Sequence, residues 1–218
     1  KNGCIDLDNL KKAMGDDVAA LMLTNPNTLG IFEPNILAIG EVVHNRGGLV
    51  YMDGANLNAL MGITRPGEFG VDVLHMNLHK TFSTPHGGGG PGAGPVGVKK
   101  ILEPYLPLPK VEQRENGEYF FNYDCPHSIG KIKAFYGNFG TLVRALAYIL
   151  ANGHNGLKNA SSVAILNANY IKEGLRDVYN LPYEGPVLHE VVFSGKKQTK
   201  NDVTVMNLAK RLMDYGFH

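Results

Sequence analysis

The stretch Asn77-Leu-His-Lys-Thr-Phe-Ser-Thr-Pro-His-Gly-Gly-Gly-Gly-Pro-Gly92 follows an apolar run, 71–76, that is typical of a buried strand. It carries Lys80, and upstream of it Asp53 ends a second apolar run, 49–52. Enzymes that use pyridoxal phosphate (PLP) need such a pair: the lysine forms a Schiff base, and the carboxylate keeps the pyridine nitrogen protonated. The pair therefore predicts a PLP site built on Lys80 and Asp53.

Buried strands and helical segments alternate along the first half of the chain, which predicts an α/β fold with a mixed or parallel sheet. The expected elements are strands at 18–24, 49–52, 71–76 and 96–98 and a helix at 35–44. Ligands of such sheets bind at the carboxyl ends of the strands. We therefore expect Asn25, Asp53 and Lys80 to converge at one edge.

The second half is predicted to begin with an irregular functional loop, because residues 104–124 are rich in prolines, charges and turn formers. The elements expected after it are helices at 141–151, 156–178 and 204–215 and a strand at 187–193. We predict three parts: 1–138 from a large PLP-binding domain, 139–178 as connecting helices, and 179–218 as the beginning of a small C-terminal α/β domain.

Composition excludes several functional classes. The chain has 218 residues with 21 basic and 20 acidic side chains, and this balance argues against a nucleic-acid partner. No apolar stretch approaches the length of a membrane span. Cys4 and Cys125 form no disulfide framework, which favours a reducing compartment. The first residue is Lys1, not methionine, and we expect both ends of the chain to be cut.

Each candidate side chain also has an ordinary interpretation. A lysine after a strand is usually a solvated charge, and Asp-Gly often forms a turn, but the motif around Lys80 favours the Schiff-base role. Asn25 could donate its amide to the phenolic oxygen of the cofactor, and Thr28 could add a hydroxyl. The alternative for both is an ordinary Asn-Pro loop.

Three histidines lie close together in the sequence. His79 is predicted to donate to the cofactor phosphate, His86 to line the mouth of the site, and His75 to be a satisfied core histidine. Residues 75, 77 and 79 would share one face of an extended strand. Zinc is disfavoured, because no glutamate lies between His75 and His79 and the segment is not plausibly a helix.

The glycine run exposes its backbone, so Gly89 and Gly90 are candidates for contacting a carboxylate or phosphate. A dinucleotide fingerprint needs a helix directly afterwards, and Pro91 and Pro95 prevent one. A lipase oxyanion loop needs a Gly-x-Ser-x-Gly elbow, which the sequence lacks. What remains is a loop that exposes its backbone and can approach a ligand closely.

Four segments together resemble the P-protein family of the glycine cleavage system: 53–62, 66–72, 77–92 and 128–138. In the last one, Lys131 stands where the family often has arginine. The resemblance implies a fold-type I PLP enzyme, similar in architecture to aspartate aminotransferase. It implies that Lys80 holds PLP, that Asp53 pairs with its ring nitrogen, and that glycine is decarboxylated. The aminomethyl group then passes to the lipoyl arm of the H-protein.

The resemblance further implies a parent oxidoreductase that is a homodimer or heterotetramer, in the bacterial cytoplasm or, alternatively, the mitochondrial matrix. The family's catalytic half extends beyond both ends of this chain, so we expect the chain alone to bind PLP weakly and to be nearly inactive. Two alternatives stay open: a non-catalytic pseudo-enzyme module, and another fold-type I aminotransferase or decarboxylase.

Overall fold

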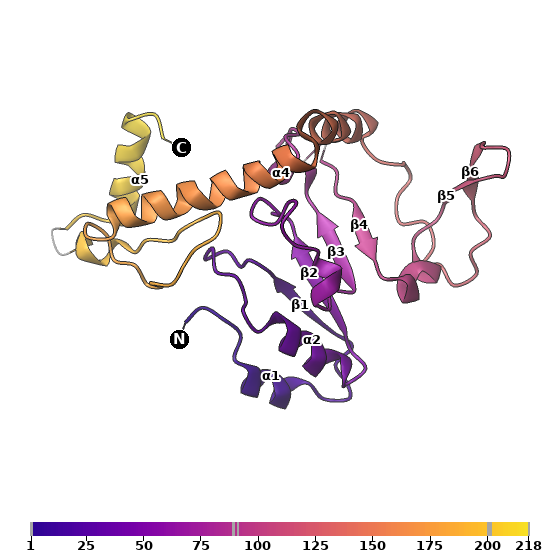
Figure 1. Cartoon of the computed structure of the whole chain (residues 1–218), viewed down its shortest axis with the longest axis horizontal. Helices are drawn as coiled ribbons and strands as arrows, with labels where there is room; N and C mark the ends of the chain where they lie inside the picture. Colours follow the sequence, from indigo (N-terminus) through magenta and orange to yellow (C-terminus); the bar gives the residue numbers. More distant parts are fainter. Residues whose placement is uncertain (1, 89, 91, 200–201, 218) are drawn as a thin grey trace.

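The computed structural model describes residues 2–88, 90, 92–199 and 202–217. It has a four-stranded mixed sheet in the order β1-β2-β3-β4, a separate hairpin and a long helix that leads to the C-terminal region (Figure 1). The elements in chain order are α1 (Leu7–Ala13), β1 (Ala20–Thr24), α2 (Ile36–His44), β2 (Leu49–Gly54), η1 (Pro66–Phe69), β3 (Val73–Met76), α3 (Leu78–Thr81), β4 (Val96–Val98), η2 (Lys100–Tyr105), β5 (Lys110–Gln113), β6 (Tyr119–Asn122), α4 (Phe139–Leu175), η3 (Gly195–Lys197) and α5 (Val205–Asp214). The expected α/β class with a mixed sheet is confirmed.

The two faces of β2 have different surroundings. Val50 and Met52 are buried against α1 and α2, where Ile39 and Val43 are fully enclosed. Burying a side chain of this size contributes about 1.5–3 kcal/mol, so this face forms the core. Tyr51 and Asp53 alternate with the core residues and therefore lie on the opposite, half-open face.

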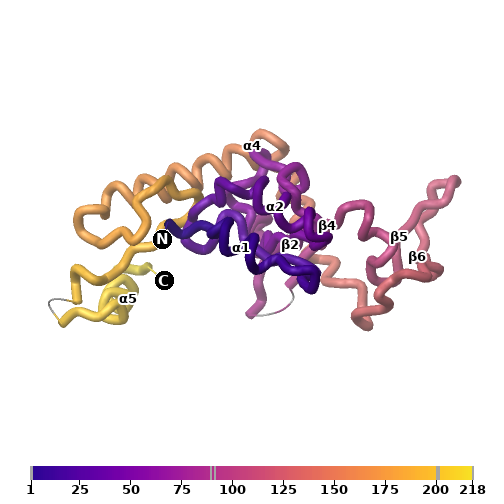
Figure 2. Tube along the Cα trace, turned by 90° about the horizontal axis from the view of Figure 1, so that it is seen from below, coloured from indigo at the N-terminus to yellow at the C-terminus, as the bar shows by residue number. Residues whose placement is uncertain are grey.

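Most of the predicted helices form. α2 matches the segment expected at 35–44, and α5 begins with a capping box at Thr204, as the segment 204–215 suggested. The two helices expected at 141–151 and 156–178 both form, and α4 comprises them with a kink between, where Gly153 leaves the helical backbone with φ 61°. Figure 1 shows α4 crossing beside the sheet and leading to α5, and Figure 2 shows it from below.

The loop predicted at 104–124 is wrong in part, because β5 and β6 pair there as an antiparallel hairpin. Its turn is tight: the Arg114 N–H donates to the Glu118 carbonyl at 2.9 Å, and Gly117 takes a left-handed φ of 86°. Figure 1 shows the hairpin projecting away from the sheet. The turn formers marked the bend correctly, but a short hairpin around them was missed.

The strand predicted at 187–193 does not form, because the backbone there bonds to other elements. The Leu188 N–H donates to the Gly30 carbonyl at 2.7 Å, and the Asn169 amide of α4 donates to the Val187 carbonyl at 2.7 Å. One isolated bridge joins Asn180 and Ser194. The segment is therefore an extended connection between the loop at Gly30 and α4, not a strand of a second sheet.

Gly30 is expected to be essential for this connection. It has φ +77°, and a Cβ at this position would collide with the Glu190 carbonyl. We predict that Gly30→Ala destabilises the chain by about 2 kcal/mol or more and releases residues 184–195. Limited proteolysis within that segment measures the release.

Gly47→Ala is the matched control for this change. Gly47 has a similar φ of +75°, but no atom lies within 4 Å of the position that a Cβ would take, so only the backbone strain is shared. Equal protease sensitivity in the two variants would contradict the role assigned to the contact between Gly30 and Glu190.

Candidate cofactor site

The carboxyl ends of three parallel strands meet at one edge of the sheet. Thr24 of β1 lies opposite Asp53 of β2, and Asp53 lies opposite His75 of β3. Asn25 follows β1 directly, and Lys80 follows β3 by one short turn. The register therefore places the three predicted positions at the same edge, which is where sheets of this class bind ligands.

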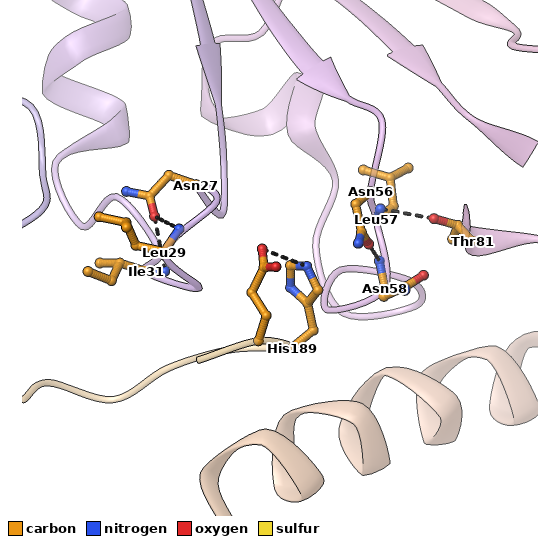
Figure 3. A network of polar contacts seen from close by, with 9 residues as sticks. Asn27, Leu29, Ile31, Asn56, Leu57, Asn58, Thr81 and His189 are labelled. Carbon is orange, nitrogen blue, oxygen red and sulfur yellow. Dashed lines mark hydrogen bonds and ion pairs between the residues drawn. The ribbon is translucent and has the colours of Figure 1, made fainter. Parts of the chain in front are cut away.

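Lys80 lies on α3, a single helical turn that includes His79, so residues 75, 77 and 79 do not share one face of an extended strand as expected. The carbonyl of Asn77 accepts the N–H groups of Lys80 and Thr81, and two buried side chains, Leu78 and Thr81, anchor the turn. The Thr81 hydroxyl also accepts the Leu57 N–H at 3.0 Å (Figure 3). Because Leu78 and Thr81 face inward, Lys80 is left on the exposed side of the turn.

The Lys80 side chain borders a cavity of about 340 Å³ between α3 and α4, together with Asn58, Thr81 and Tyr148. Within the described part of the chain, its amine makes no hydrogen bond or ion pair. An amine without a partner next to a cavity can react with a carbonyl carbon once it is deprotonated.

Asp53 contacts a histidine that the sequence analysis assigned to the core. Its Oδ1 accepts the Ala55 N–H at 2.9 Å and lies 3.2 Å from Nε2 of His75. The other ring nitrogen of His75, Nδ1, is 2.9 Å from the Tyr51 hydroxyl. His75 is only half-buried and belongs to the open face, so the core interpretation is corrected. The pairing followed from strand register, which the sequence did not specify.

Asn25 is almost fully buried, and its Oδ1 accepts the Glu33 N–H at 2.9 Å. Its amide nitrogen has no hydrogen-bond partner among the described residues, so it keeps a donor available. Thr28 is exposed and borders a different cavity of about 400 Å³ with Cys4 and Glu33. The structure therefore places Asn25 at the strand edge with Asp53, but leaves Thr28 apart from Lys80.

His79 and His86 form an edge-to-face pair with ring centroids 4.6 Å apart. Burial, then the nearby His86 and Lys80, lower the pKa of His79 below its ordinary value. His79 borders a cavity of about 550 Å³ with Gly90 and Phe135, whereas Lys80 borders the cavity beside α4. His79 and Lys80 thus lie next to different cavities. Gly89 lies outside the described residues.

His189, which no sequence pattern marked, lies between the loops 27–31 and 56–58 in Figure 3. Its side chain is 6% exposed, and neither ring nitrogen has a hydrogen-bond partner among the described residues, although Nε2 lies 3.3 Å from the Glu190 carboxylate. Burial lowers the pKa of His189, outweighing the opposite effect of Glu190. Only the approach of the segment around Leu188 to Gly30 brings this histidine to the strand edge.

The chain is 58% identical over all of its 218 residues to the probable glycine dehydrogenase (decarboxylating) subunit 2 of Caldanaerobacter subterraneus subsp. tengcongensis. All 218 residues of the chain therefore resemble part of a glycine dehydrogenase (decarboxylating) subunit 2. The corresponding Bacillus cereus subunit is 56% identical over the whole chain. The chain spans less than half of these relatives, 45% and 44% of their lengths.

Two further comparisons agree with this glycine dehydrogenase resemblance. A family model described as glycine dehydrogenase, C-terminal domain, matches residues 160–218. An inhibitor-bound glycine decarboxylase (P-protein) of the glycine cleavage system superposes with a TM-score of 0.64 and 22% identity, covering 80% of this chain and 42% of that one. The expected resemblance to the P-protein is confirmed.

A cysteine desulfurase from Thermococcus onnurineus also superposes with a TM-score of 0.64, at 17% identity, and covers 98% of this chain and 52% of its own. At such low identity, both structural neighbours establish the fold alone. The chain therefore has the fold of the fold-type I PLP enzymes, as expected. Within the described ranges, no helix is long and apolar enough to cross a membrane.

Proposed function

We propose that this chain carries the cofactor lysine of a PLP-dependent glycine decarboxylase. The supporting observation is that Lys80 has an amine without a partner among the described residues, and that it follows β3 at the edge where Asp53 is the penultimate residue of the neighbouring β2. The glycine dehydrogenase relatives supply the substrate, glycine, and the release of carbon dioxide. We also propose that residues 1–138 belong to a large PLP-binding domain, 139–178 to connecting helices, and 179–218 to a small C-terminal domain.

The side chains at the strand edge fit PLP. Lys80 offers an amine, the Asp53 carboxylate is about one-third exposed with Oδ2 accepting no hydrogen bond from the described residues, and Asn25 keeps an unpaired amide. These groups match an aldehyde carbon, a pyridinium nitrogen and a phenolic oxygen, respectively. The donor and acceptor types therefore agree with what the cofactor would present.

Bound PLP would supply an electron sink for the carbanion left when carbon dioxide departs. In that reaction Lys80 would hold the cofactor covalently and exchange its place with the amine of glycine. Asp53 would keep the ring nitrogen protonated, because an opposite charge favours the protonated form. Asn25 would donate its amide N–H, and His79 is proposed to bind the phosphate. The exposed Thr28 could contribute only if its loop approached the edge.

His86 and Gly90 are proposed to line the channel that admits the lipoyl arm of an H-protein, and Gly89, expected there too, lies outside the described residues. A cavity of about 650 Å³ lies between the hairpin and the glycine segment, and it is lined by Phe121 and Phe135 among others. It shares Gly92 and Phe135 with the cavity beside His79, so the two adjoin. An apolar channel suits the hydrocarbon part of a lipoyl chain.

The test is exchange of labelled carbon dioxide into glycine in the presence of a lipoyl H-protein. This chain would replace the matching stretch of the Caldanaerobacter subunit, assayed together with its companion subunit. We expect exchange that depends on the H-protein and falls at least about a thousandfold in Lys80→Ala, since covalent catalysis is lost.

Two outcomes would replace the proposal. A visible PLP band without glycine exchange, combined with amino transfer from another amino acid, would favour a different fold-type I enzyme. Absence of both the band and the exchange would favour a pseudo-enzyme module. Shortening the hairpin at 110–122 tests the proposed channel. If the channel admits the lipoyl arm, transfer of the aminomethyl group to the H-protein should slow in this variant.

The relatives are bacterial, and we propose the bacterial cytoplasm as the location of the parent enzyme. We also propose that the parent is a homodimer or heterotetramer. The subunit designation of the relatives supports an assembly with more than one kind of chain.

A further inference from the structure

We propose that His75 is a positioning residue for the Asp53 carboxylate, and that Tyr51 selects the ring tautomer with which His75 does this. The inference deepens the proposed function, because it matters to catalysis only if Asp53 meets a pyridine nitrogen. Its structural part can be tested without any cofactor.

The three side chains share one face of the sheet for a simple geometric reason. Tyr51 and Asp53 are two residues apart on β2, and His75 is the register partner of Asp53 on β3. The rings of Tyr51 and His75 lie 5.8 Å apart with an interplanar angle of 41°. Register and pleat alone therefore bring the phenol, the imidazole and the carboxylate into one row.

The contacts of His75 indicate which of its ring nitrogens carries the hydrogen. A phenol O–H donates readily to an imidazole nitrogen, and Nδ1 of His75 lies 2.9 Å from the Tyr51 hydroxyl. If Nδ1 accepts this hydrogen bond, it carries no hydrogen of its own, and the ring hydrogen of a neutral His75 must be on Nε2. That nitrogen lies 3.2 Å from Oδ1 of Asp53. Tyr51 thus turns the N–H of His75 toward the carboxylate.

The consequence concerns which oxygen of Asp53 meets a ligand. Oδ1 already accepts the Ala55 N–H at 2.9 Å, and His75 approaches the same oxygen. The hydrogen bond from Ala55 and the 3.2 Å electrostatic contact with His75 both act on Oδ1, and together they hold the carboxylate against rotation about its last bond. Oδ2 then remains in a fixed position for the ring nitrogen. Pre-orientation of this kind strengthens binding by reducing the ordering cost.

The surroundings of Asp53 differ from those of Asp72, a second aspartate that pairs with a histidine and has a structural role. Asp72 also pairs with a histidine, His44, but it is fully buried, and its carboxylate also contacts the Val50 N–H and Lys99. Asp53 instead has a side chain that is 32% exposed and an oxygen without a donor among the described residues. The two pairs differ in what a ligand could reach.

Ring nitrogen-15 NMR of histidine-labelled chain at about pH 8.5, where ordinary imidazole is neutral, tests the structural part. The His75 signals are identified by their loss in His75→Gln. We expect the Nε2–H tautomer in the unchanged chain and a mixture of tautomers in Tyr51→Phe. An Nδ1–H tautomer, or a tautomer that Tyr51→Phe leaves unchanged, would overturn the proposal.

The functional part is tested by the dissociation constant for PLP. His75→Leu removes the electrostatic contact with Asp53 and should raise this constant about tenfold. His75→Gln keeps a side-chain N–H at a similar place and should recover most of the affinity. Equal affinities for unchanged chain, His75→Leu and His75→Gln would overturn it.

The two experiments distinguish a failure of the positioning role of His75 from a failure of the proposed function. If the unchanged chain binds no PLP, the proposed function fails, and the tautomer alone decides whether Tyr51 and His75 orient Asp53. If PLP binds and the tautomer is wrong, the positioning role fails while the cofactor site stands. Lys80→Ala should remove the covalent attachment and leave the His75 tautomer as it was.

Discussion

Lys80→Ala is expected to abolish the covalent attachment of PLP to this chain. When the chain is incubated with PLP and reduced with borohydride, peptide mass mapping should find the modified lysine at position 80. The adduct should be weak, because less than half of the length of the relatives is present. In Lys80→Ala, specific modification should fall to the background seen at other exposed lysines.

The physical reason lies in the surroundings of Lys80. Its amine has no partner within the described ranges and borders a cavity beside the strand edge. Only the neutral form of an amine attacks an aldehyde, and no carboxylate of the described residues pairs with the Lys80 amine. A bound PLP phosphate and ring nitrogen would also raise the local concentration of the aldehyde.

Lys100→Ala is the matched control, since Lys100 is an exposed lysine at the start of η2. It should leave the adduct at Lys80 unchanged. A distribution of adducts over many lysines that does not respond to Lys80→Ala would contradict the assignment. A strong adduct at Lys80 would contradict the expectation of weak binding instead.

Asp72→Asn is expected to destabilise the fold by about 3 kcal/mol, as breaking a buried charged network usually does. Asp72 is 3% exposed, and its carboxylate receives the Val50 N–H at 2.7 Å, lies 2.7 Å from Nε2 of His44 and contacts Lys99 at 3.0 Å. An asparagine would remove the negative charge and leave Lys99 without its partner. Urea unfolding, with an unchanged m-value, measures the loss.

The same carboxylate makes stability depend on pH. Burial would raise the pKa of Asp72, but the hydrogen bonds from Val50, His44 and Lys99 outweigh it and hold the pKa below its usual value. A lowered folded-state pKa means that the stabilisation is fully present above the unfolded pKa, about 3.9. It is lost as the pH falls through the folded-state pKa. Asp72→Asn should flatten this acidic part of the stability curve.

Asp16→Asn is the control for this change. Asp16 pairs with Arg46 at 3.6 Å, but its side chain is 97% exposed, so solvent screens the pair. It should not measurably change the urea midpoint. A comparable loss in both variants would show that general charge balance, not the buried network, sets the stability.

The strands and helices whose pattern is local were predictable. Apolar runs bounded by turn residues located β1, β2 and β3, and 3.6-residue spacing located α2. The helix stop at Gly153 and the cap at Thr204 follow from local chemistry too. The hairpin at 110–122 and the turn α3 were missed, since each is short and depends on the few residues that pack or pair around it.

The proposed roles of Lys80 and Asp53 were predictable from the sequence, because residue type and position after a buried run indicate the strand edge. The partners of Asp53 were not. His75 comes from a different strand than Asp53, and only the register of β2 against β3 sets it beside the carboxylate and the Tyr51 hydroxyl. His189 reaches the edge only because residues 187–190 bond to Gly30 and α4 and do not form a strand.

The amino-acid sequence by itself thus determined the α/β class and placed Lys80 and Asp53, the two residues proposed to hold the cofactor, near the carboxyl ends of neighbouring strands. Periodicity and turn chemistry act between near neighbours, so they are readable without coordinates. The tertiary structure alone decided which oxygen of Asp53 is left open, that Lys80 and His79 border different cavities, and that Thr28 lies apart. Those features depend on strand register and on segments far apart in the chain, whose contacts no local pattern encodes.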